Sequence, residues 1–452
     1  MFEVFGYISI MLAVILIWFA AFKRPIYEGI LVSFLVLVGI TKRWGNLWEY
    51  CDTALTTSLL YSMMAFSAMS QILTKTKVID KCVMIIISLL GRIPGGAGYA
   101  AVAASSFMGA LSGSGPGNVM ATGSITIPAM IKSGYPPELA ANVESASSYL
   151  GNMIPPSANI VAALGAFLAV YPDSNITSGS FWIVCWGVSL WFVLSRFIQL
   201  FLFCKYYKIK PMPKEDIPSL KQSLKEGWTG LLLPVIILVP FIFDFVFNAS
   251  FLTNRLGAEG AKYFSSSLLI FVGGIATLYG IFVAPNKKEL TPKAVVTLFA
   301  DKVKGLAPTV ATCILGYLIG ALFTDLNVGE ELRIAFTEMN MSYTALAFII
   351  PLITCFLSMV IPGSSIVVML GSAFISIFAA AGADPLLVAA MLPCVCGVMG
   401  GITPPFALGM YAGMAIAKSD FSKTLKNDLW WVAAQYALEV VVLLGLLPVI
   451  GL

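Results

Sequence analysis

Long apolar stretches separated by short charged segments run through the whole chain. A helix that crosses a bilayer needs about 20 apolar residues. By that criterion the sequence predicts spanning helices at 2–22, 26–41, 53–74, 181–203, 228–247, 264–284, 303–324 and 428–450. The segments 79–92 and 328–339 carry mixed charge instead, and they predict amphipathic helices near the membrane surfaces.

Two further apolar regions, 94–170 and 341–417, are interrupted repeatedly by glycine, proline, serine and asparagine. The same landmarks recur in both regions, each about 250 residues apart, which indicates an internal repeat. The matching pairs are Gly113-Ser114 with Gly363-Ser364, Gly134 with Gly382, Pro137 with Pro385, and Pro155-Pro156 with Pro404-Pro405. We therefore expect an all-α integral membrane protein with two repeats. Each repeat would hold three helices, a re-entrant hairpin, a broken helix and a closing helix.

This repeat also sets the expected domain boundaries. A first repeat would cover 1–203 and a second 228–452, joined by a cytoplasmic loop and surface helix at 204–227. The expected re-entrant hairpins are about 94–132 and about 341–381, and the expected broken helices are about 137–170 and about 385–417.

Composition and charge place these elements in a membrane. The chain is 59% hydrophobic and 11% charged, which leaves too little polar surface to cover a water-soluble core. With the N-terminus outside, 22 of the 27 basic residues, Arg196 among them, fall inside, as the positive-inside rule requires. Lys42 and Arg43 are the local exception. One hairpin then enters from each face, so we expect inverted repeats, which are typical of secondary carriers.

The interrupted backbone supplies the candidate chemistry. Broken helices expose carbonyl ends that can coordinate a cation and amide ends that can receive an anion. Hydroxyl and carbonyl oxygens suit Na⁺-like cations, and the chain has no histidine, the commonest transition-metal ligand. The first tip (Ser112, Gly113, Ser114, Gly115 and Asn118) would face the break at 152–157, and the second tip (Gly363, Ser364 and Ser365) would face Gly400, Gly401 and Thr403.

A few side chains inside the apolar stretches need a separate interpretation. Glu144 lies inside a predicted span, where it could help to bind cations, carry a proton, or hydrogen-bond a neighbouring helix. Asp244 and Glu439 have no helix breaker nearby, which favours a structural role for both. Cys394 and Cys396 form a C-x-C pattern that is more often packing than chemistry.

Four segments together resemble the large membrane subunit of TRAP (tripartite ATP-independent periplasmic) transporters, DctM-like proteins of the ion transporter superfamily. They are SGSGPGNVMATGSITIPAMIKSGY at 112–135, LGNMIPPS at 150–157, the stretch from Trp228 to Gly280 that precedes Glu289-Leu290-Thr291, and GGITPPFALGMYAGMAIA at 400–417. The resemblance covers nearly the whole chain. It implies an elevator-type carrier in a bacterial or archaeal inner membrane that imports carboxylates or sulfonates, with Na⁺ as the coupling ion and no other cofactor.

The resemblance also implies partners and site residues. The partners would be a separate four-helix small membrane subunit and a periplasmic substrate-binding protein, and the segment VESASS at 143–148 leans toward the branch that uses TAXI-type binding proteins. The implied cation-binding residues are Ser112, Gly113, Ser114, Asn118, Asn152, Gly363, Ser364, Gly401 and Thr403. The implied substrate-binding residues are Ser114, Gly115, Asn118, Ser157, Ser365 and Thr403.

Two alternatives stay open at this point. A stand-alone carrier or exchanger of the same superfamily would be active without any partner. A membrane-embedded enzyme would need a catalytic cluster at membrane depth, and the absence of histidine and of a paired-acid motif argues against it. Neither the sequence nor its charge pattern indicates a nucleic-acid partner, and Na⁺ and H⁺ both remain candidates for the coupling ion.

Overall fold

The structure is a computed structural model that describes residues 2–112, 115–286, 288–338, 341–359, 361–404 and 407–452. All regular secondary structure in these segments is helical, which confirms the predicted all-α class. The first half holds α1 (Phe2–Ala20), α2 (Ile26–Thr41), α3 (Leu47–Thr56), α4 (Ser58–Leu73), α5 (Val78–Leu90), α6 (Gly96–Ser112), α7 (Gly115–Lys132), α8 (Pro137–Leu150), α9 (Ala158–Val170) and α10 (Ser178–Tyr206). The second half holds α11 (Leu220–Gly227), α12 (Leu232–Phe247), α13 (Thr253–Phe282), α14 (Pro292–Asp325), α15 (Val328–Glu338), α16 (Tyr343–Ser358), α17 (Gly363–Ala380), α18 (Pro385–Gly397), α19 (Leu408–Ala417) and α20 (Phe421–Leu443).

Proline and glycine set the same helix boundaries in both halves. Pro137 opens α8 and Pro385 opens α18, because a proline at the first helical position loses no intrahelical hydrogen bond. The turns before these helices contain Gly134 and Gly382 with φ of +90° and +93°, a conformation that glycine adopts without strain. Two helix pairs, α6–α7 and α16–α17, therefore each precede a broken helix, α8–α9 and α18–α19.

Four of the predicted spans differ from the observed helices by more than a few residues. Those predicted at 264–284 and 303–324 begin earlier, at Thr253 and Pro292. The span predicted at 53–74 is two helices, α3 and α4, because Thr57 is extended with φ −65° and ψ 124°. The span predicted at 428–450 begins and ends earlier, at Phe421 and Leu443. Gly445, with φ +68°, turns the chain just after this helix. Threonine and glycine favour such helix ends, but the apolar pattern alone did not reveal them.

Helix length and apolar surface support a multi-pass membrane protein. Within the described residues, four helical segments are long and apolar enough to cross a membrane: Pro137–Val170, Ser178–Tyr206, Lys214–Phe282 and Gly363–Ala380. Shorter apolar helices accompany them, including Ile26–Thr41 and Val310–Asp325. Large apolar side chains on α12 and α13 point outward, with Phe271 at 66% and Leu278 at 69% exposure, as expected of a surface in contact with lipid.

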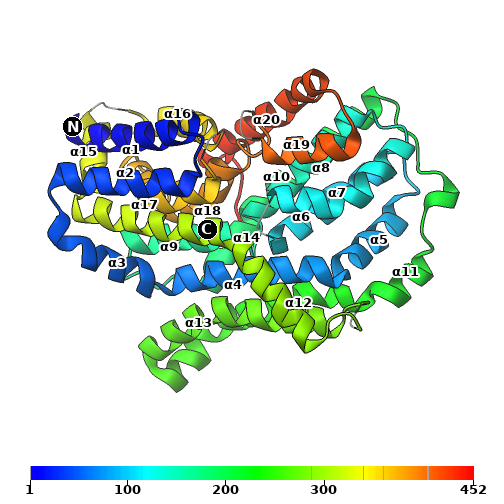
Figure 1. Ribbon diagram of the computed structural model, residues 1–452, viewed down its shortest axis with the longest axis horizontal. Coiled ribbons are helices and arrows are strands. Elements are labelled where there is room, and N and C mark those ends of the chain that lie inside the picture. Colours follow the sequence, from blue (N-terminus) through cyan, green and yellow to red (C-terminus); the bar gives the residue numbers. More distant parts are fainter. Residues whose placement is uncertain (1, 113–114, 287, 339–340, 360, 405–406) are drawn as a thin grey trace.

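Packing joins the two halves of the chain in matching pairs. The hairpin helix α7 packs against α19 of the other half, and α17 packs against α9. Within each half, α6 contacts α8 and α16 contacts α18. In Figure 1, α6, α7, α8 and α19 lie together on one side of the molecule, and α9 and α17 lie together on the other. Both breaks therefore lie in the interior. The inversion of the repeats relative to the membrane stays a prediction.

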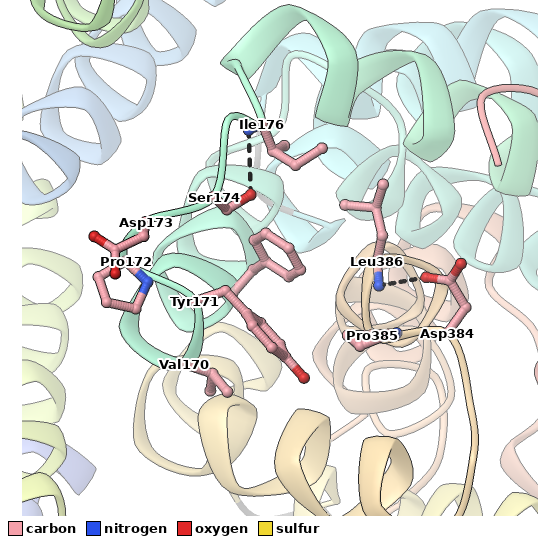
Figure 2. Close-up of a pocket in the computed structure, with 10 residues that line it drawn as sticks. Val170, Tyr171, Pro172, Asp173, Ser174, Ile176, Asp384, Pro385 and Leu386 are labelled. Carbon is pink, nitrogen blue, oxygen red and sulfur yellow. Dashed lines mark hydrogen bonds between the residues drawn. The ribbon is translucent and has the colours of Figure 1, made fainter. Parts of the chain in front are cut away.

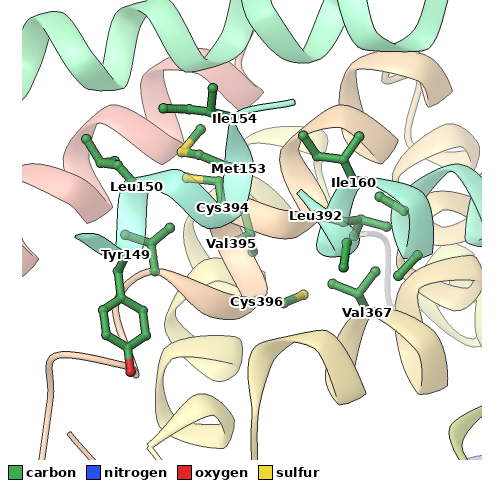
Figure 3. Packing of buried hydrophobic residues seen from close by; sticks show 14 of the residues in the cluster. Tyr149, Leu150, Met153, Ile154, Ile160, Val367, Leu392, Cys394, Val395 and Cys396 are labelled. Carbon is green, nitrogen blue, oxygen red and sulfur yellow. The ribbon is translucent and has the colours of Figure 1, made fainter. Parts of the chain in front are cut away.

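The interior around the two breaks is densely apolar. Leu150, Met153 and Ile154 surround the first break, and each is at most 3% exposed. Figure 3 shows these side chains beside α18, with the thiol of Cys394 directed toward Met153 and that of Cys396 directed away from it. Both cysteines are buried and unbridged, as the packing interpretation predicts. In such a core an unpaired polar group is costly, so each polar side chain at the breaks needs an account.

Arg43, one of the two exceptions to the charge rule, has partners on a neighbouring helix. The guanidinium Nε of Arg43 lies 3.3 Å from Oδ2 of Asp325 at the end of α14. The same carboxylate oxygen accepts hydrogen bonds from the hydroxyl of Tyr50 at 2.5 Å and from the amide of Asn46 at 3.3 Å. Arg43 is therefore paired with an acidic side chain of α14, and its guanidinium is held at that helix end.

Arg196 has an environment that the charge pattern did not indicate. The pattern counted it among the basic residues on the cytoplasmic side, and the structure buries its side chain to 1% exposure between α10 and α20. The burial follows from contacts across the fold, because Arg196 lies within the 29-residue helix α10 and has its polar partners on α20.

Candidate functional site

A cavity of about 550 Å³ lies where both helix pairs and both breaks meet. Hairpin helices contribute Gly115 and Pro116 from α7 and Gly363 and Ser364 from α17. Three helices end at the cavity, α8, α16 and α18, and the lining includes residues at or just beyond their last turns. The complete described lining is Pro25, Ile26, Tyr27, Gly115, Pro116, Tyr149, Asn152, Asn159, Pro308, Thr312, Ser358, Pro362, Gly363, Ser364, Gly397, Gly401 and Leu408.

Four helix N-termini open onto this cavity. The first turns of α7, α9, α17 and α19 contribute Gly115, Asn159, Gly363 and Leu408 to the lining. Pro362 precedes α17, and no described side chain caps this helix. The first amide groups of a helix have no intrahelical partner and carry partial positive charge. Four helix N-termini thus border the cavity, while none of its described lining residues has a charged side chain.

Tyr149 lies at the centre of the arrangement, and the sequence analysis missed it. A Cβ built on Gly401 would lie 1.7 Å from Cε1 of the Tyr149 ring, one on Gly115 would lie 2.5 Å from Cε2, and one on Gly409 would lie 2.3 Å from Cε2. Three backbone segments from both halves therefore contact one ring, and only glycine permits this approach. The available signal was an aromatic residue directly before the LGNMIPPS break, three positions before Asn152, together with glycines in the segments that pack against it.

The two breaks share a second close approach. Gly151, at the first break, abuts the backbone of Gly109 in α6, where an added Cβ would lie 2.1 Å from the carbonyl carbon. At the second break Gly400 abuts Ser358 at the end of α16. A Cβ added to Gly400 would lie 2.2 Å from the carbonyl carbon of Ser358. In each half the break is thus held against the first helix of its own hairpin. The carbonyl of Met153 in the first break also accepts a hydrogen bond from Ser189 of α10 at 2.7 Å.

Two polar atoms at the site lack a partner within the described chain. The amide oxygen Oδ1 of Asn152 and the hydroxyl of Ser365 are both buried and unbonded there. Asn152 lines the cavity, so its oxygen is available to a bound species. An orphaned buried acceptor costs about 1–3 kcal/mol, which a coordinated cation would offset.

The remaining predicted residues are divided between the cavity and its surroundings. Ser157 caps α9, where its hydroxyl accepts from the amide of Asn159 at 3.3 Å. The hydroxyl of Thr403 donates to the carbonyl of Met399 at 2.7 Å. Ser112 is the last residue of α6, and Gly113 and Ser114 lie outside the described residues. Of the predicted set, the cavity lining therefore contains Gly115, Asn152, Gly363, Ser364 and Gly401.

Glu144 lies behind the cavity in a closed network of hydroxyl groups. Its Oε1 accepts from Ser105 at 2.7 Å, Thr122 at 2.5 Å and Ser148 at 3.1 Å, and its Oε2 accepts from Thr126. Its side chain is fully buried, and no ion pair to it is found among the described residues.

Asn118 belongs to the same network as Glu144. Its amide nitrogen donates to the carbonyl of Ser105 at 2.7 Å and to the hydroxyl of Ser148 at 2.9 Å. These contacts join α6, α7 and α8 to one another, and the structure places Asn118 here rather than in the cavity lining.

A second pocket, of about 410 Å³, lies elsewhere and suits an anion poorly. Figure 2 shows it between the loop that contains Pro172 and Ser174 and the start of α18. Its lining includes the carboxylates of Asp173 and Asp384. Asp384 accepts from the amides of Leu386 at 2.7 Å and Leu387 at 3.2 Å, so it acts as the N-cap of α18.

The profile of the family described as "Tripartite ATP-independent periplasmic transporter, DctM component" matches residues 4–450. The chain belongs to this family. A C4-dicarboxylate TRAP transporter large permease protein of Vibrio cholerae is 28% identical over 398 residues, which cover 84% of this chain and 83% of that protein. The corresponding protein of Pseudomonas aeruginosa is 26% identical over 344 residues, 76% of this chain and 74% of that protein. The chain is therefore a transporter permease and not an enzyme.

Solved structures agree on the fold. Neisseria gonorrhoeae MtrF aligns with a TM-score of 0.65 at 17% identity, covering 91% of this chain and 86% of its own. The Alcanivorax borkumensis YdaH transporter aligns with a TM-score of 0.60 at 15% identity, covering 90% of this chain and 88% of its own. At these identities the likeness is one of fold alone.

Membership of the TRAP family also implies partners. A tripartite transporter of this kind includes a small membrane subunit and a periplasmic binding protein beside the large permease. An isethionate TRAP transporter permease protein, DctMQ, of Oleidesulfovibrio alaskensis is 23% identical over 361 residues, which cover 77% of this chain and 51% of that protein. That longer relative supports a small subunit as partner of the DctM-like part.

Proposed function

We propose that this TRAP large permease imports a small organic anion through the cavity of about 550 Å³ at its helix breaks, coupled to cations and with an elevator-type movement. The supporting observation is the convergence of four helix N-termini on a cavity whose described lining has no charged side chain. The volume falls within the range of about 300–1,000 Å³ that small-molecule sites occupy.

Backbone amides are the groups available to an anionic cargo. Each helix N-terminus carries the equivalent of roughly +0.5 charge, and hydrogen bonds to a charged acceptor contribute about 1.5–3 kcal/mol each. The first turns of α7 and α17 would therefore receive a carboxylate or sulfonate. The hydroxyl of Ser364 and the side-chain amide of Asn159 would be further contacts. Because no lysine or arginine lines the described cavity, cations that bind together with the substrate would balance its remaining charge.

The residues at the breaks fit a hard monovalent cation such as Na⁺. Asn152 offers an unbonded buried amide oxygen, and backbone carbonyl groups lie at the ends of α8 and α18. The first predicted cation site consists of Ser112, Gly113, Ser114, Asn118 and Asn152, and the second consists of Gly363, Ser364, Gly401 and Thr403. Bound there, the cation would supply positive charge beside the anion. Glu144 is the alternative coupling group, as a proton carrier.

The position of the cavity supports a sliding movement. One wall comes from α2 and α14, through Tyr27, Pro308 and Thr312, and the opposite wall comes from the hairpins and breaks. A shift of the hairpins and breaks past α2 and α14 would expose the same cavity to each side of the membrane in turn. We place the protein in the cytoplasmic membrane, with a binding protein that delivers substrate from the periplasmic side.

The names of relatives and the cavity lining support one class of substrate. Relatives are named for C4-dicarboxylate, sialic acid and isethionate. Small acidic substrates suit a cavity that is bordered by helix N-termini and has no charged side chain among its described lining residues. We therefore propose carboxylates or sulfonates as substrates of this permease.

Uptake by proteoliposomes tests the proposal. The permease is reconstituted with its small subunit and binding protein, and uptake of a C4-dicarboxylate, sialic acid and isethionate is measured under imposed Na⁺ or proton gradients. We expect Asn152→Ala to weaken the cation dependence of uptake, whereas Asn254→Ala, at an exposed asparagine of α13, leaves it unchanged. An unaltered cation dependence in Asn152→Ala refutes the site, and uptake without any partner favours a stand-alone carrier instead.

A further inference from the structure

A second buried cluster of charged side chains lies behind the cavity. Arg196 of α10 and Asp428 and Glu439 of α20 are each at most 1% exposed. They lie at the contact of α10, α18 and α20, with α8 packed against α20 beside them. One guanidinium and two carboxyl groups thus share an interior from which water is excluded, and the transport cavity uses none of them.

Neutral groups hold the guanidinium of Arg196. Its Nη2 donates to Oε1 of Gln435 at 2.8 Å, and its Nη1 donates to the backbone carbonyl of Trp431 at 3.4 Å. The guanidinium carbon also lies 5.4 Å from the centroid of the Trp431 ring, within the range of cation–π attraction. Within the described chain no carboxylate oxygen lies within 4.0 Å of Arg196.

The two carboxyl groups are held separately. Oε1 of Glu439 accepts from Nε2 of Gln435 at 3.0 Å and from the thiol of Cys394 at 3.3 Å. Oδ1 of Asp428 accepts from the amide of Asn142 at 3.2 Å. Gln435 therefore connects Arg196 to Glu439 through its two amide atoms, and the cluster joins helices from both halves of the chain.

Several polar atoms of this cluster have no partner among the described residues. Oε2 of Glu439, Oδ1 of Asn142, Nε of Arg196 and Nε1 of Trp431 are all buried and unbonded there. Two of them are acceptors, so the cluster has capacity for a proton that no described donor supplies. A purely structural network would be expected to satisfy its own groups, because each unpaired buried polar group costs about 1–3 kcal/mol.

Charge balance decides what the cluster binds. One arginine and two ionised carboxylates would leave a net charge of −1 in the interior, and an uncompensated buried charge costs several kcal/mol. The other titratable groups around Glu439 are the thiols of Cys355, Cys394 and Cys396 and the phenol of Tyr436, which are neutral and cannot balance it. One added proton makes the cluster neutral.

We propose that the cluster binds a single exchangeable proton, which resides on either Asp428 or Glu439 while the other acid balances Arg196, so that this cluster is a proton-binding site of the permease. The site is connected to the cavity through α18. Cys394 contacts Glu439 and lies one helical turn before Gly397, which lines the cavity. A change in protonation at Glu439 therefore acts on the helix end that borders the cavity. The proposal does not depend on which ion drives transport.

Infrared spectroscopy of the purified protein in lipid vesicles tests this directly, because a protonated carboxyl group has its own carbonyl stretching band. At neutral pH we expect Glu439→Gln and Asp428→Asn each to remove the band of one protonated carboxyl group, since the remaining acid then pairs with Arg196 as an anion. Asp325→Asn, which alters a carboxylate already paired with Arg43, is the control and should leave the region unchanged.

A third variant sharpens the test. Arg196→Met removes the positive charge, so both acids should be protonated and one carboxyl band should be gained. If that variant does not fold, the two carboxamide variants decide alone. The proposal is overturned if either of them leaves the protonated-carboxyl region unchanged, or if folded Arg196→Met shows no gain. Because no transport is measured, this outcome is independent of the proposed import function.

Discussion

Substitution of Gly401 by alanine perturbs the contact between the second break and Tyr149 with a predictable cost. The added Cβ would lie 1.7 Å from Cε1 of the tyrosine ring, whereas carbon atoms pack at about 3.5–4.0 Å, so ring or backbone must shift by roughly 2 Å. The ring cannot easily move away, because Gly115 and Gly409 press on its other edge. Overpacking of a buried site costs about 1–3 kcal/mol, and we expect the upper part of that range.

Thermal unfolding of the purified permease measures this cost. Uptake by the reconstituted transporter shows whether the shift of the ring or backbone also disturbs the cavity. Gly274→Ala is the matched control, since its Cβ would meet nothing within 4 Å and alanine favours the helix. We expect lower stability and slower uptake in Gly401→Ala and neither effect in the control. Combining Gly401→Ala with Tyr149→Leu should lose less stability than the sum of the two single changes. Equal stability and uptake of Gly401→Ala and the control would refute the packing argument.

Three further predictions concern polar groups. Glu144→Gln places an amide donor among four hydroxyl groups and should lower the free energy of unfolding by about 1–3 kcal/mol. A changed pH profile of uptake in this variant would indicate proton coupling, and an unchanged profile would indicate that Glu144 is a structural hydrogen-bond acceptor. Ser189→Ala leaves the carbonyl of Met153 without its hydroxyl donor and should cost about 1 kcal/mol in chemical denaturation, an effect absent if water replaces the hydroxyl. Asp325→Asn weakens the pair with Arg43 and should cost about 1 kcal/mol or less, with a difference from wild type that shrinks in high salt.

Much of the fold could be predicted from local sequence signals. The helix at 26–41 has the predicted bounds, and α8 and α18 begin at the prolines that marked the expected broken helices. The mixed-charge segments predicted at 79–92 and 328–339 are the helices α5 and α15. Apolar length, proline and glycine act within a few residues of their own position, which is why these features can be read from the chain.

Other features depend on contacts that no local pattern contains. Gln435 lies 239 positions from Arg196, and Asp428 lies 286 positions from Asn142. Arg196 lies inside the span predicted at 181–203, and nothing in that span indicates its partners on α20. Tyr149 resembles any aromatic residue near the end of a helix. The surroundings of Arg196 and Tyr149 are formed where helices of the two halves pack together. Such contacts between distant parts of the chain cannot be read from the residues next to either one.

The central claim is that helix ends from both halves of the chain form one cavity that receives an anion together with cations. The most direct measurement is accumulation of a radiolabelled C4-dicarboxylate, sialic acid or isethionate in proteoliposomes that contain the permease, its small subunit and its binding protein. The account predicts uptake above the equilibrium level when a Na⁺ or a proton gradient is imposed, and only equilibration when both are collapsed. Accumulation that is the same with and without either gradient would contradict it.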